Sequence, residues 1–326
     1  MMLVTGGAGF IGSHVVAALE ERSRGPIAVC DTLDEDKWRN LAKRRLAEVV
    51  PPEALLDWLG PRRDIEAVVH MGAISSTTAT DEAETMRVNY ALPVALWDWC
   101  AANSVRLVYA SSAATYGDGS QGFDDEFGQN ALARLQPLNL YGRSKHAFDR
   151  EVARRVATGA KTPPHWAGLK FFNVYGPNEY HKAGQTSVVL QNWREAKASG
   201  RAILFRSHNP NYADGGQSRD FIWVGDCADV VLWLLDATGA NGLYNVGTGK
   251  ARSFKDLAAA VFAALGRTPN IEYVDTPIAI RDKYQYFTEA RMKRLRTAGY
   301  AKPFTALEDG VAHYVQGYLE TVDPYR

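Results

Sequence analysis

The stretch "MLVTGGAGFIGSHVVAALEE" at the start of the chain constrains the fold most strongly. A short apolar run, which predicts a strand, leads through Gly6, Gly9 and Gly12 into a predicted helix. Glycines at this spacing bring backbone N–H groups and a helix N-terminus close to a pyrophosphate. Asp31 follows a second apolar run, roughly 20 residues further on, where a carboxylate can bind a ribose hydroxyl. The pattern predicts a dinucleotide-binding site on a strand–turn–helix unit.

The first half of the chain alternates short apolar runs with helical patterns. We expect strands at residues 2–5, 27–31, 67–73, 106–112 and 165–176, and helices at 10–21, at 88–103 and from Tyr141 onward. This alternation predicts an α/β fold with a doubly wound parallel sheet, covered by helices on both faces. We assign residues 1–175 to a Rossmann-type dinucleotide-binding domain, to which later segments also contribute.

The pattern loosens beyond residue 175 and predicts a smaller α/β lobe over residues 176–326. The expected helices are 185–198, 226–236, 254–265 and 304–320, and the expected strands are "AILF", "RDFIWV" and "LYNVG". Such a lobe would lie over the carboxyl edge of the sheet, where open α/β sheets bind their ligands. It would supply most of the substrate-binding residues.

The composition favours a protein that binds small molecules or another copy of itself. The chain has 326 residues, is 46% apolar, and carries 37 basic and 37 acidic residues, so no global charge attracts nucleic acid. We find no signal peptide, and no apolar run of about 18 residues that would predict a membrane span. Three distant cysteines, Cys30, Cys100 and Cys227, favour buried free thiols in a reducing cytoplasm over disulfides or metal ligands.

The residues after the second strand leave the choice of dinucleotide open. Asp31 alone favours NAD, because its carboxylate would repel a 2′-phosphate. Lys37 and Arg39 follow within "DTLDEDKWRN", and either could neutralise such a phosphate. Both could equally be solvated loop charges. The sequence therefore predicts NADP or NAD.

Tyr141 and Lys145 form a Tyr-x-x-x-Lys pair in "YGRSK", on a predicted helix. One helical turn places both side chains on the same face, where the ammonium can lower the pKa of the phenol and bind the ribose of a nicotinamide. The chain has 15 tyrosines, so the pair is meaningful only with its partners. Ser112, at a strand end in "YASSAATYG", can hydrogen-bond a substrate oxygen beside Tyr141, although alone it is typical of a turn. Together they predict an acid–base site.

Four segments, "TGGAGFIGS", "SSAATYG", "YGRSK" and "FFNVYGP", together resemble the extended short-chain dehydrogenase/reductase superfamily and its NAD-dependent epimerase/dehydratase family. The resemblance covers nearly the whole chain and implies an enzyme acting on nucleotide sugars. More narrowly, "GAISSTT", "FFNVYGPNEYHK", "RDFIWVGDCADV" and "DKYQYFT" resemble the family of ADP-L-glycero-D-manno-heptose 6-epimerases. That resemblance implies a homo-oligomer, a pentamer, that uses NADP and inverts C6 of an ADP-linked heptose of the bacterial lipopolysaccharide core.

The resemblance also explains why a second lysine, Lys182, follows the strand end in "FFNVYGPNEYHK". Inversion through a 6-keto intermediate requires the ketone to turn over, so that its oxygen occupies a different place. Tyr141 can exchange the proton in one orientation, with Ser112 assisting, and the family's second lysine matches Lys182 in the other. Partial burial would shift Lys182 toward its neutral form. The alternative is an exposed loop lysine.

Further contacts are implied by the same resemblance. On the cofactor side they are Phe10, Ile11, Thr32, Met71, Gly72, Ala73, Asn89 and Val174, besides the three glycines, Asp31, Lys37 and Lys145. On the substrate side they are Asn173, His181, Phe205, Arg219 and Tyr284. Arg219 could pair with a diphosphate or form a structural ion pair with Asp220 or another acid. Phe205 and Tyr284 could equally be core aromatics, Asn173 a turn residue and His181 a surface residue.

Some segments depart from the family pattern. The loop after Asp31 is slightly shorter, the loops at 118–139 and 208–218 are longer, and Gly184 and Gln191 stand where a serine and a histidine are expected. Two alternatives stay open: another nucleotide-sugar enzyme, either a 4-epimerase or a 4,6-dehydratase, and a non-catalytic cofactor-sensing protein. The alanines of "SSAATYG" disfavour a dehydratase, which needs an acidic pair beside the serine. The intact tyrosine and lysines disfavour a sensor.

Overall fold

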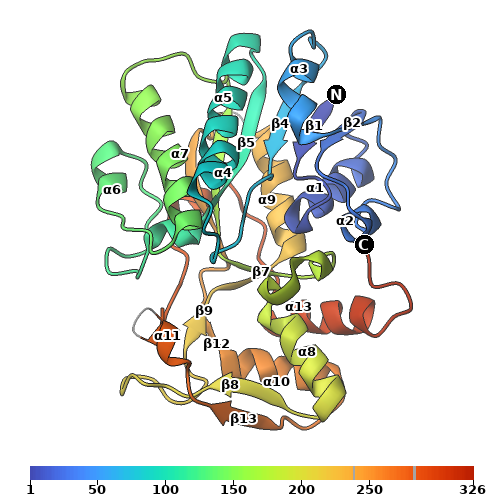
Figure 1. Ribbon diagram of the computed structural model, residues 1–326, viewed down its shortest axis with the longest axis vertical. Coiled ribbons are helices and arrows are strands. Elements are labelled where there is room, and N and C mark those ends of the chain that lie inside the picture. Colours follow the sequence, from blue (N-terminus) through green and yellow to red (C-terminus); the bar gives the residue numbers. More distant parts are fainter. Residues whose placement is uncertain (238, 282–283) are drawn as a thin grey trace.

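A parallel sheet of seven strands forms the centre of the molecule (Figure 1). The computed structural model describes residues 1–237, 239–281 and 284–326. In spatial order the sheet contains β3 (Glu48–Val50), β2 (Ile27–Cys30), β1 (Met2–Thr5), β4 (Ala67–His70), β5 (Arg106–Ser112), β6 (Trp166–Phe171) and β11 (Gly242–Val246). All neighbouring strands are parallel, and β1 pairs with both β2 and β4. This order is that of a doubly wound sheet and confirms the predicted fold class.

Helices cover both faces of this sheet. α1 (Phe10–Glu21) and α9 (Val224–Asp236) pack on one face, whereas α3 (Leu55–Leu59), α5 (Leu92–Asn103) and α7 (Leu140–Ala157) pack on the other. Successive strand residues point to opposite faces, so Met2 and Val4 join the core beneath α1, and Leu3 joins the core beneath α5. Because both faces are buried, the strands read as continuous apolar runs in the sequence.

Two segments that we expected in the smaller lobe lie in the main sheet and its layers. α9 packs against α1, and β11 pairs with β6 at the edge of the sheet. Local periodicity indicates whether a segment is a helix or a strand, but it does not indicate the layer that the segment joins. These two elements are later segments of the chain that complete the first domain.

The smaller lobe lies below the sheet in Figure 1. Its main helices, α8 (Val188–Ser199), α10 (Phe254–Ala264) and α13 (Leu307–Tyr314), fall close to the expected ranges. β8 (Ala202–Phe205) pairs in parallel with β13 (Ile271–Val274), a strand that the sequence did not predict. Between sheet and lobe, β7 (Asn173–Tyr175) pairs with β10 (Phe221–Trp223), and β9 (Ser218–Arg219) pairs with β12 (Arg252–Ser253).

Shorter elements complete the structure. They are α2 (Glu35–Arg39), α4 (Glu82–Met86), α6 (Gln129–Ala133), α11 (Ile278–Arg281), α12 (Lys293–Thr297), and the short turns of helix η1 (Pro52–Ala54), η2 (Arg87–Ala91), η3 (Ala113–Tyr116), η4 (Tyr180–Gln185) and η5 (Val315–Leu319). Cys30, Cys100 and Cys227 are buried free thiols, as predicted. Within the described ranges, no helix is both long and apolar enough to cross a membrane.

Candidate active site

A cavity of about 870 Å³ lies at the carboxyl ends of the sheet strands, beneath the segment that follows β7. It brings together predicted residues from distant parts of the sequence: Gly6, Gly9, Phe10, Ile11, Gly12, Asp31, Lys37, Met71, Gly72, Ala73, Ser112, Tyr141, Lys145, Asn173, Val174, His181 and Lys182. Five other predicted residues, Thr32, Asn89, Phe205, Arg219 and Tyr284, are not part of its lining. The cavity is therefore the candidate active site.

The turn between β1 and α1 leaves room for a phosphate-bearing ligand. Gly6 has a φ of 66°, a left-handed conformation that glycine adopts without steric cost. A Cβ on Gly12 would collide with the carbonyl oxygen of Gly6, and a Cβ on Gly6 would collide with the backbone of Gly72. Gly9 caps α1 without a side-chain hydrogen bond. The first turn of α1 thus presents backbone N–H groups to the cavity, and these residues fit the pyrophosphate of a dinucleotide.

Asp31 lies at the end of β2 with both carboxylate oxygens engaged. One oxygen accepts a hydrogen bond from the N–H of Ala8 at 2.9 Å, and the other accepts from Nζ of Lys37 at 3.1 Å. Arg39 instead lies over the ring of Tyr325, 4.6 Å from its centroid. Lys37 therefore neutralises Asp31 beside the glycine turn, whereas the exposed Arg39 does not line the cavity.

Tyr141, Lys145 and Ser112 meet on one side of the cavity. Tyr141 and Lys145 lie one turn apart on α7, as the Tyr-x-x-x-Lys spacing predicts. Ser112 ends β5, and its Oγ accepts a hydrogen bond from the N–H of Ala114 at 3.1 Å. Ser112 therefore caps a turn and also faces the cavity, so its two alternative roles are compatible.

Burial shifts the pKa values of both α7 residues. The pKa of Tyr141 is raised by burial, while a hydrogen bond with Ser112 acts in the opposite direction. The pKa of Lys145 is lowered to about 8 by burial, and Asp149 acts to raise it. Nζ of Lys145 donates to the carbonyl of Ala110, 2.9 Å away. The shift of Tyr141 is opposite to the lowering that we expected, because the desolvation of a phenolate outweighs the hydrogen bond with Ser112.

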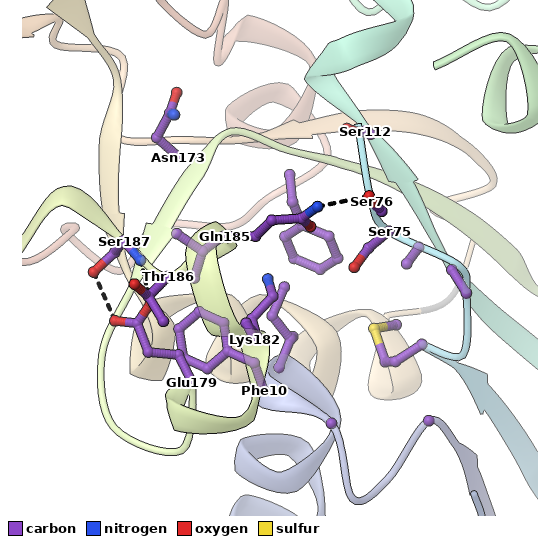
Figure 2. Close-up of a pocket in the computed structure, with 18 of the residues that line it drawn as sticks. Phe10, Ser75, Ser76, Ser112, Asn173, Glu179, Lys182, Gln185, Thr186 and Ser187 are labelled. Atoms are coloured by element: carbon purple, nitrogen blue, oxygen red, sulfur yellow. Dashed lines mark hydrogen bonds between the residues drawn. The ribbon is translucent and has the colours of Figure 1, made fainter. Parts of the chain in front are cut away.

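Lys182 reaches the cavity from a different element. It lies in η4, and its Nζ is 5.4 Å from the ring centroid of Phe10. Figure 2 shows the Lys182 side chain between Phe10 and Gln185. Burial lowers the pKa of Lys182, whereas Glu179 acts to raise it. The cavity therefore contains two groups that can exchange protons, Tyr141 on α7 and Lys182 on η4.

A buried ion pair supports α7 from behind the cavity. Asp149 accepts a hydrogen bond from Oγ of Ser111 at 2.7 Å and lies 3.5 Å from Nζ of Lys170. Lys170, on β6, donates to Oγ1 of Thr115 at 2.8 Å and is completely buried. Burial raises the pKa of Asp149, and Lys170 opposes this shift. The pair ties α7 to the sheet, and the same carboxylate influences the pKa of Lys145.

Asn89 lies outside the lining of the cavity, whereas His181 is part of it. The side-chain amide of Asn89 is buried and binds both the N–H and the carbonyl of Ile74 at 2.9 Å, so it positions a cavity loop without lining the cavity. Nδ1 of His181 lies 3.4 Å from the amide nitrogen of Asn40. Burial lowers the pKa of His181, and Lys37 lowers it further. His181 therefore lines the cavity close to Lys37 and Lys182, and its contact with substrate stays a prediction.

Arg219, Phe205 and Tyr284 form a group of their own in the smaller lobe. The guanidinium of Arg219 is 5.5 Å from the ring centroid of Tyr284, and the rings of Phe205 and Tyr284 are 6.1 Å apart. Burial lowers the pKa of Arg219. Asp220 does not pair with this arginine, because it accepts hydrogen bonds from the N–H and Oγ1 of Thr248, both at 2.7 Å. Thr32, which we expected on the cofactor side, is exposed beyond the end of β2 and does not line the cavity.

Sequence reasoning missed the groups that hold Lys182 in place. Glu179 is buried and accepts a hydrogen bond from the hydroxyl of Tyr314 at 3.1 Å. Nε2 of Gln185 donates to Oγ of Ser76 at 2.6 Å. Neither contact has a local sequence signal, because each joins segments that are far apart in the chain. Of the site residues that were missed, only Lys170 of the buried ion pair had a usable signal in the sequence. A lysine inside the apolar run "GLKFF" requires a buried partner.

Comparison with known proteins identifies the family. The model of the NAD dependent epimerase/dehydratase family matches residues 2–247. A protein of Nitratidesulfovibrio vulgaris named ADP-L-glycero-D-manno-heptose-6-epimerase is 48% identical, over 100% of this chain and 100% of its own. The solved ADP-L-glycero-D-manno-heptose-6-epimerase of Helicobacter pylori is 27% identical with a TM-score of 0.80, covering 97% of this chain and 95% of that chain.

A second solved structure bears on the cofactor. The UDP-glucose 4-epimerase of Thermus thermophilus, in complex with NAD, is 27% identical with a TM-score of 0.78, covering 98% of this chain and 99% of that chain. Together with the family's dependence on NAD, it supports a nicotinamide dinucleotide as the cofactor. The chain thus belongs to the NAD dependent epimerase/dehydratase family and, within it, to the ADP-L-glycero-D-manno-heptose-6-epimerases.

Proposed function

We propose that this protein is an isomerase that converts ADP-D-glycero-β-D-manno-heptose into ADP-L-glycero-β-D-manno-heptose by inverting C6. The observation that carries this proposal is that Tyr141 and Lys182 reach one cavity from two elements. A simple oxidation needs one acid–base group, whereas reduction of the opposite face of the same carbon requires proton exchange at a second position of the oxygen. The names of the full-length relatives supply the substrate.

The residues have distinct proposed roles. The nicotinamide, when bound, accepts the C6 hydride and supplies it again for the opposite face. Tyr141 removes the hydroxyl proton in one orientation of the sugar, with Ser112 hydrogen-bonded to the same oxygen. C6 lies outside the sugar ring, so a local bond rotation turns the ketone over, and Lys182 then exchanges the proton of the second orientation. Lys145 binds the ribose of the cofactor, and Asn173 binds a sugar hydroxyl.

We propose NADP as the preferred cofactor. Gly6, Gly9 and Gly12 would hold its pyrophosphate at the first turn of α1. Lys37 supports the choice of NADP, because it neutralises the carboxylate of Asp31 that would otherwise repel a 2′-phosphate. Release of the bound nucleotide by denaturation and its identification by mass spectrometry would decide between NADP and NAD.

The nucleotide end of the substrate has a proposed site in the smaller lobe. Arg219 can bind a diphosphate through its planar fork, since Asp220 is engaged elsewhere. Phe205 and Tyr284 can pack against the base or the sugar, beside the same guanidinium.

We also propose that the protein acts in the cytoplasm as a homo-oligomer, a pentamer by family resemblance. Light scattering of the purified protein tests the oligomeric state.

The function can be tested by NMR of the purified protein with ADP-D-glycero-β-D-manno-heptose, following the signals of C6 without added cofactor. Conversion to the L-glycero epimer would support both the substrate and a retained nicotinamide. No conversion after addition of NADP and NAD would refute the proposed substrate. A parallel screen of nucleotide sugars for C4 epimers and for 4-keto-6-deoxy products distinguishes the 4-epimerase and dehydratase alternatives, and no reaction in any assay would favour a cofactor-sensing protein.

A further inference from the structure

The segment that carries Lys182 is anchored at its base by a buried carboxylate. Glu179, before the segment, accepts hydrogen bonds from the N–H and the Oγ of Ser187, after it, the latter at 2.6 Å. The hydroxyl of Tyr314 donates to the same carboxylate at 3.1 Å. Figure 2 shows Glu179 and Ser187 side by side, with dashed lines for the hydrogen bonds between them. Residues 180–186, called here the gate segment, therefore contain η4 and are flanked by two residues that are bonded to each other.

The tip of the gate segment touches the opposite wall of the cavity. Nε2 of Gln185 donates to Oγ of Ser76 at 2.6 Å, a contact visible in Figure 2. Ser76 is itself held within its loop, because its hydroxyl lies 3.0 Å from Oγ1 of Thr78 and accepts a hydrogen bond from the N–H of Thr78 at 3.3 Å. The receiving loop is itself held by Asn89, which binds both backbone groups of Ile74. The exposed side chain of Gln185 thus binds Ser76 on a loop that is held by its own hydrogen bonds.

The backbone between Lys182 and Gln185 has the character of a hinge. Ala183 has φ 47° and ψ −124°, a region that residues with a Cβ rarely adopt. Gly184 follows, and a Cβ there would meet no neighbouring atom. Ala183, Gly184 and Gln185 are all exposed. A strained residue next to an unrestrained glycine can change conformation without disturbing the Glu179 anchor.

We propose that Gln185 is a positioning residue that closes the gate segment over the cavity by binding Ser76, and so retains the ketone until it is reduced. This inference rests on the proposed function. Oxidation transfers the C6 hydride to the bound nicotinamide and the hydroxyl proton to Tyr141 or Lys182. A ketone that escapes before hydride return leaves both on the protein, which then cannot complete the turnover. The contact between Gln185 and Ser76 therefore keeps the ketone in the cavity while it rotates, and it holds Lys182 over the cavity.

The test compares Gln185→Ala, Ser76→Ala and the double variant with the unmodified holoenzyme. Amide hydrogen exchange of residues 180–186, followed by mass spectrometry, measures opening independently of any reaction. A second readout traps free ketone with a carbonyl reagent and counts it per turnover. Loss of one neutral hydrogen bond should raise both opening and ketone release roughly 2- to 10-fold. The double variant should show no more than either single variant, because both remove the same contact.

Two controls separate this role from general damage. Gln316 is exposed and donates its side-chain amide to the carbonyl of Ala264, so Gln316→Ala removes a comparable bond elsewhere and should change neither readout. Ser76→Thr keeps the hydroxyl and should restore near-normal retention. Unchanged exchange in Gln185→Ala, or additive effects in the double variant, would overturn the proposal. If the holoenzyme itself fails to epimerise the heptose, the proposed function fails, whereas hydrogen exchange still decides whether the contact closes the gate segment.

Discussion

At the scale of single residues, the proposed chemistry depends on two proton-exchanging groups with different environments. Tyr141 sits on α7 beside Ser112, and burial raises its pKa. Lys182 sits on the gate segment over Phe10, and burial lowers its pKa. A buried lysine loses its proton at a lower pH than an exposed one, so Lys182 becomes a base nearer to neutral pH. The two groups also reach the cavity from different elements, which the two orientations of the sugar oxygen require.

Replacing each group separately should produce opposite defects. We expect Tyr141→Phe and Lys182→Gln each to slow epimerisation by at least about 100-fold, because each removes one acid–base group. Each variant should still oxidise one heptose epimer, and the preferred epimer should differ between them. Single-turnover absorbance of the reduced nicotinamide measures this for each epimer. Two variants that favour the same epimer would contradict the assignment of one group to each orientation.

The buried pair of Asp149 and Lys170 makes a prediction about stability. Lys170→Met leaves the carboxylate of Asp149 without its cation in a dry interior, so we expect a loss of roughly 3–5 kcal/mol in the free energy of unfolding. Urea denaturation measures this change. Lys161→Met, at an exposed lysine, should cost far less. A loss in Lys170→Met no larger than in this control would show that the pair does not stabilise the fold.

At the scale of elements, the turn between β1 and α1 makes the strictest demand on residue type. Gly12→Ala would drive a Cβ into the carbonyl oxygen of Gly6, so the first turn of α1 would have to move. We expect the dinucleotide to bind more than about tenfold more weakly, a change of about 1.4 kcal/mol. Calorimetric titration with NADP and NAD measures the affinity. Gly128→Ala, where a Cβ meets no neighbour, is the matched control and should bind normally.

The predictability of the elements follows from their burial. Strands β1, β2, β4, β5 and β6 were recognised because both faces are covered and their sequences are almost wholly apolar. The edge strand β3 was missed, because it has only three residues and begins with the partly exposed Glu48. In the site, the glycine turn and the Tyr-x-x-x-Lys pair could be predicted, because each is a local pattern in the sequence. The Glu179 anchor and the Gln185–Ser76 contact could not, because they depend on tertiary packing.

At the scale of the whole molecule, the last residues of the chain tie the smaller lobe to the first domain. After α13 the chain returns to the region of α1 and α2, as Figure 1 shows. The side chain of Arg326 contacts Nδ1 of His14 at 2.9 Å and binds Glu21, and its N–H donates to Asn178. Nε2 of His14 also bonds the carbonyl of Pro177 at 3.0 Å. His14 therefore joins α1, the final residues and the strand end that leads to the gate segment.

This position gives His14 a predictable effect on acid stability. Burial and the neighbouring Arg326 lower the pKa of His14 to about 3, whereas in the unfolded chain a histidine titrates near about 6.5. Between these values the unfolded chain binds one more proton, so stability is full above about pH 6.5 and falls as the pH drops, by about 1.4 kcal/mol per pH unit. His14→Gln, which can donate and accept at the same sites, should remove this contribution to the slope.

Urea denaturation at several pH values between about 6.5 and about 4 measures the slope for both proteins. Both proteins keep all other ionisable groups, so the difference between the slopes reports the contribution of His14. His208→Gln makes the same substitution at an exposed histidine and is the matched control. Parallel slopes for His14→Gln and the unmodified protein would mean that His14 accepts a proton while the fold remains closed. In that case the junction of α1 with the final residues would tolerate a charge facing Arg326, which its burial and short contacts argue against.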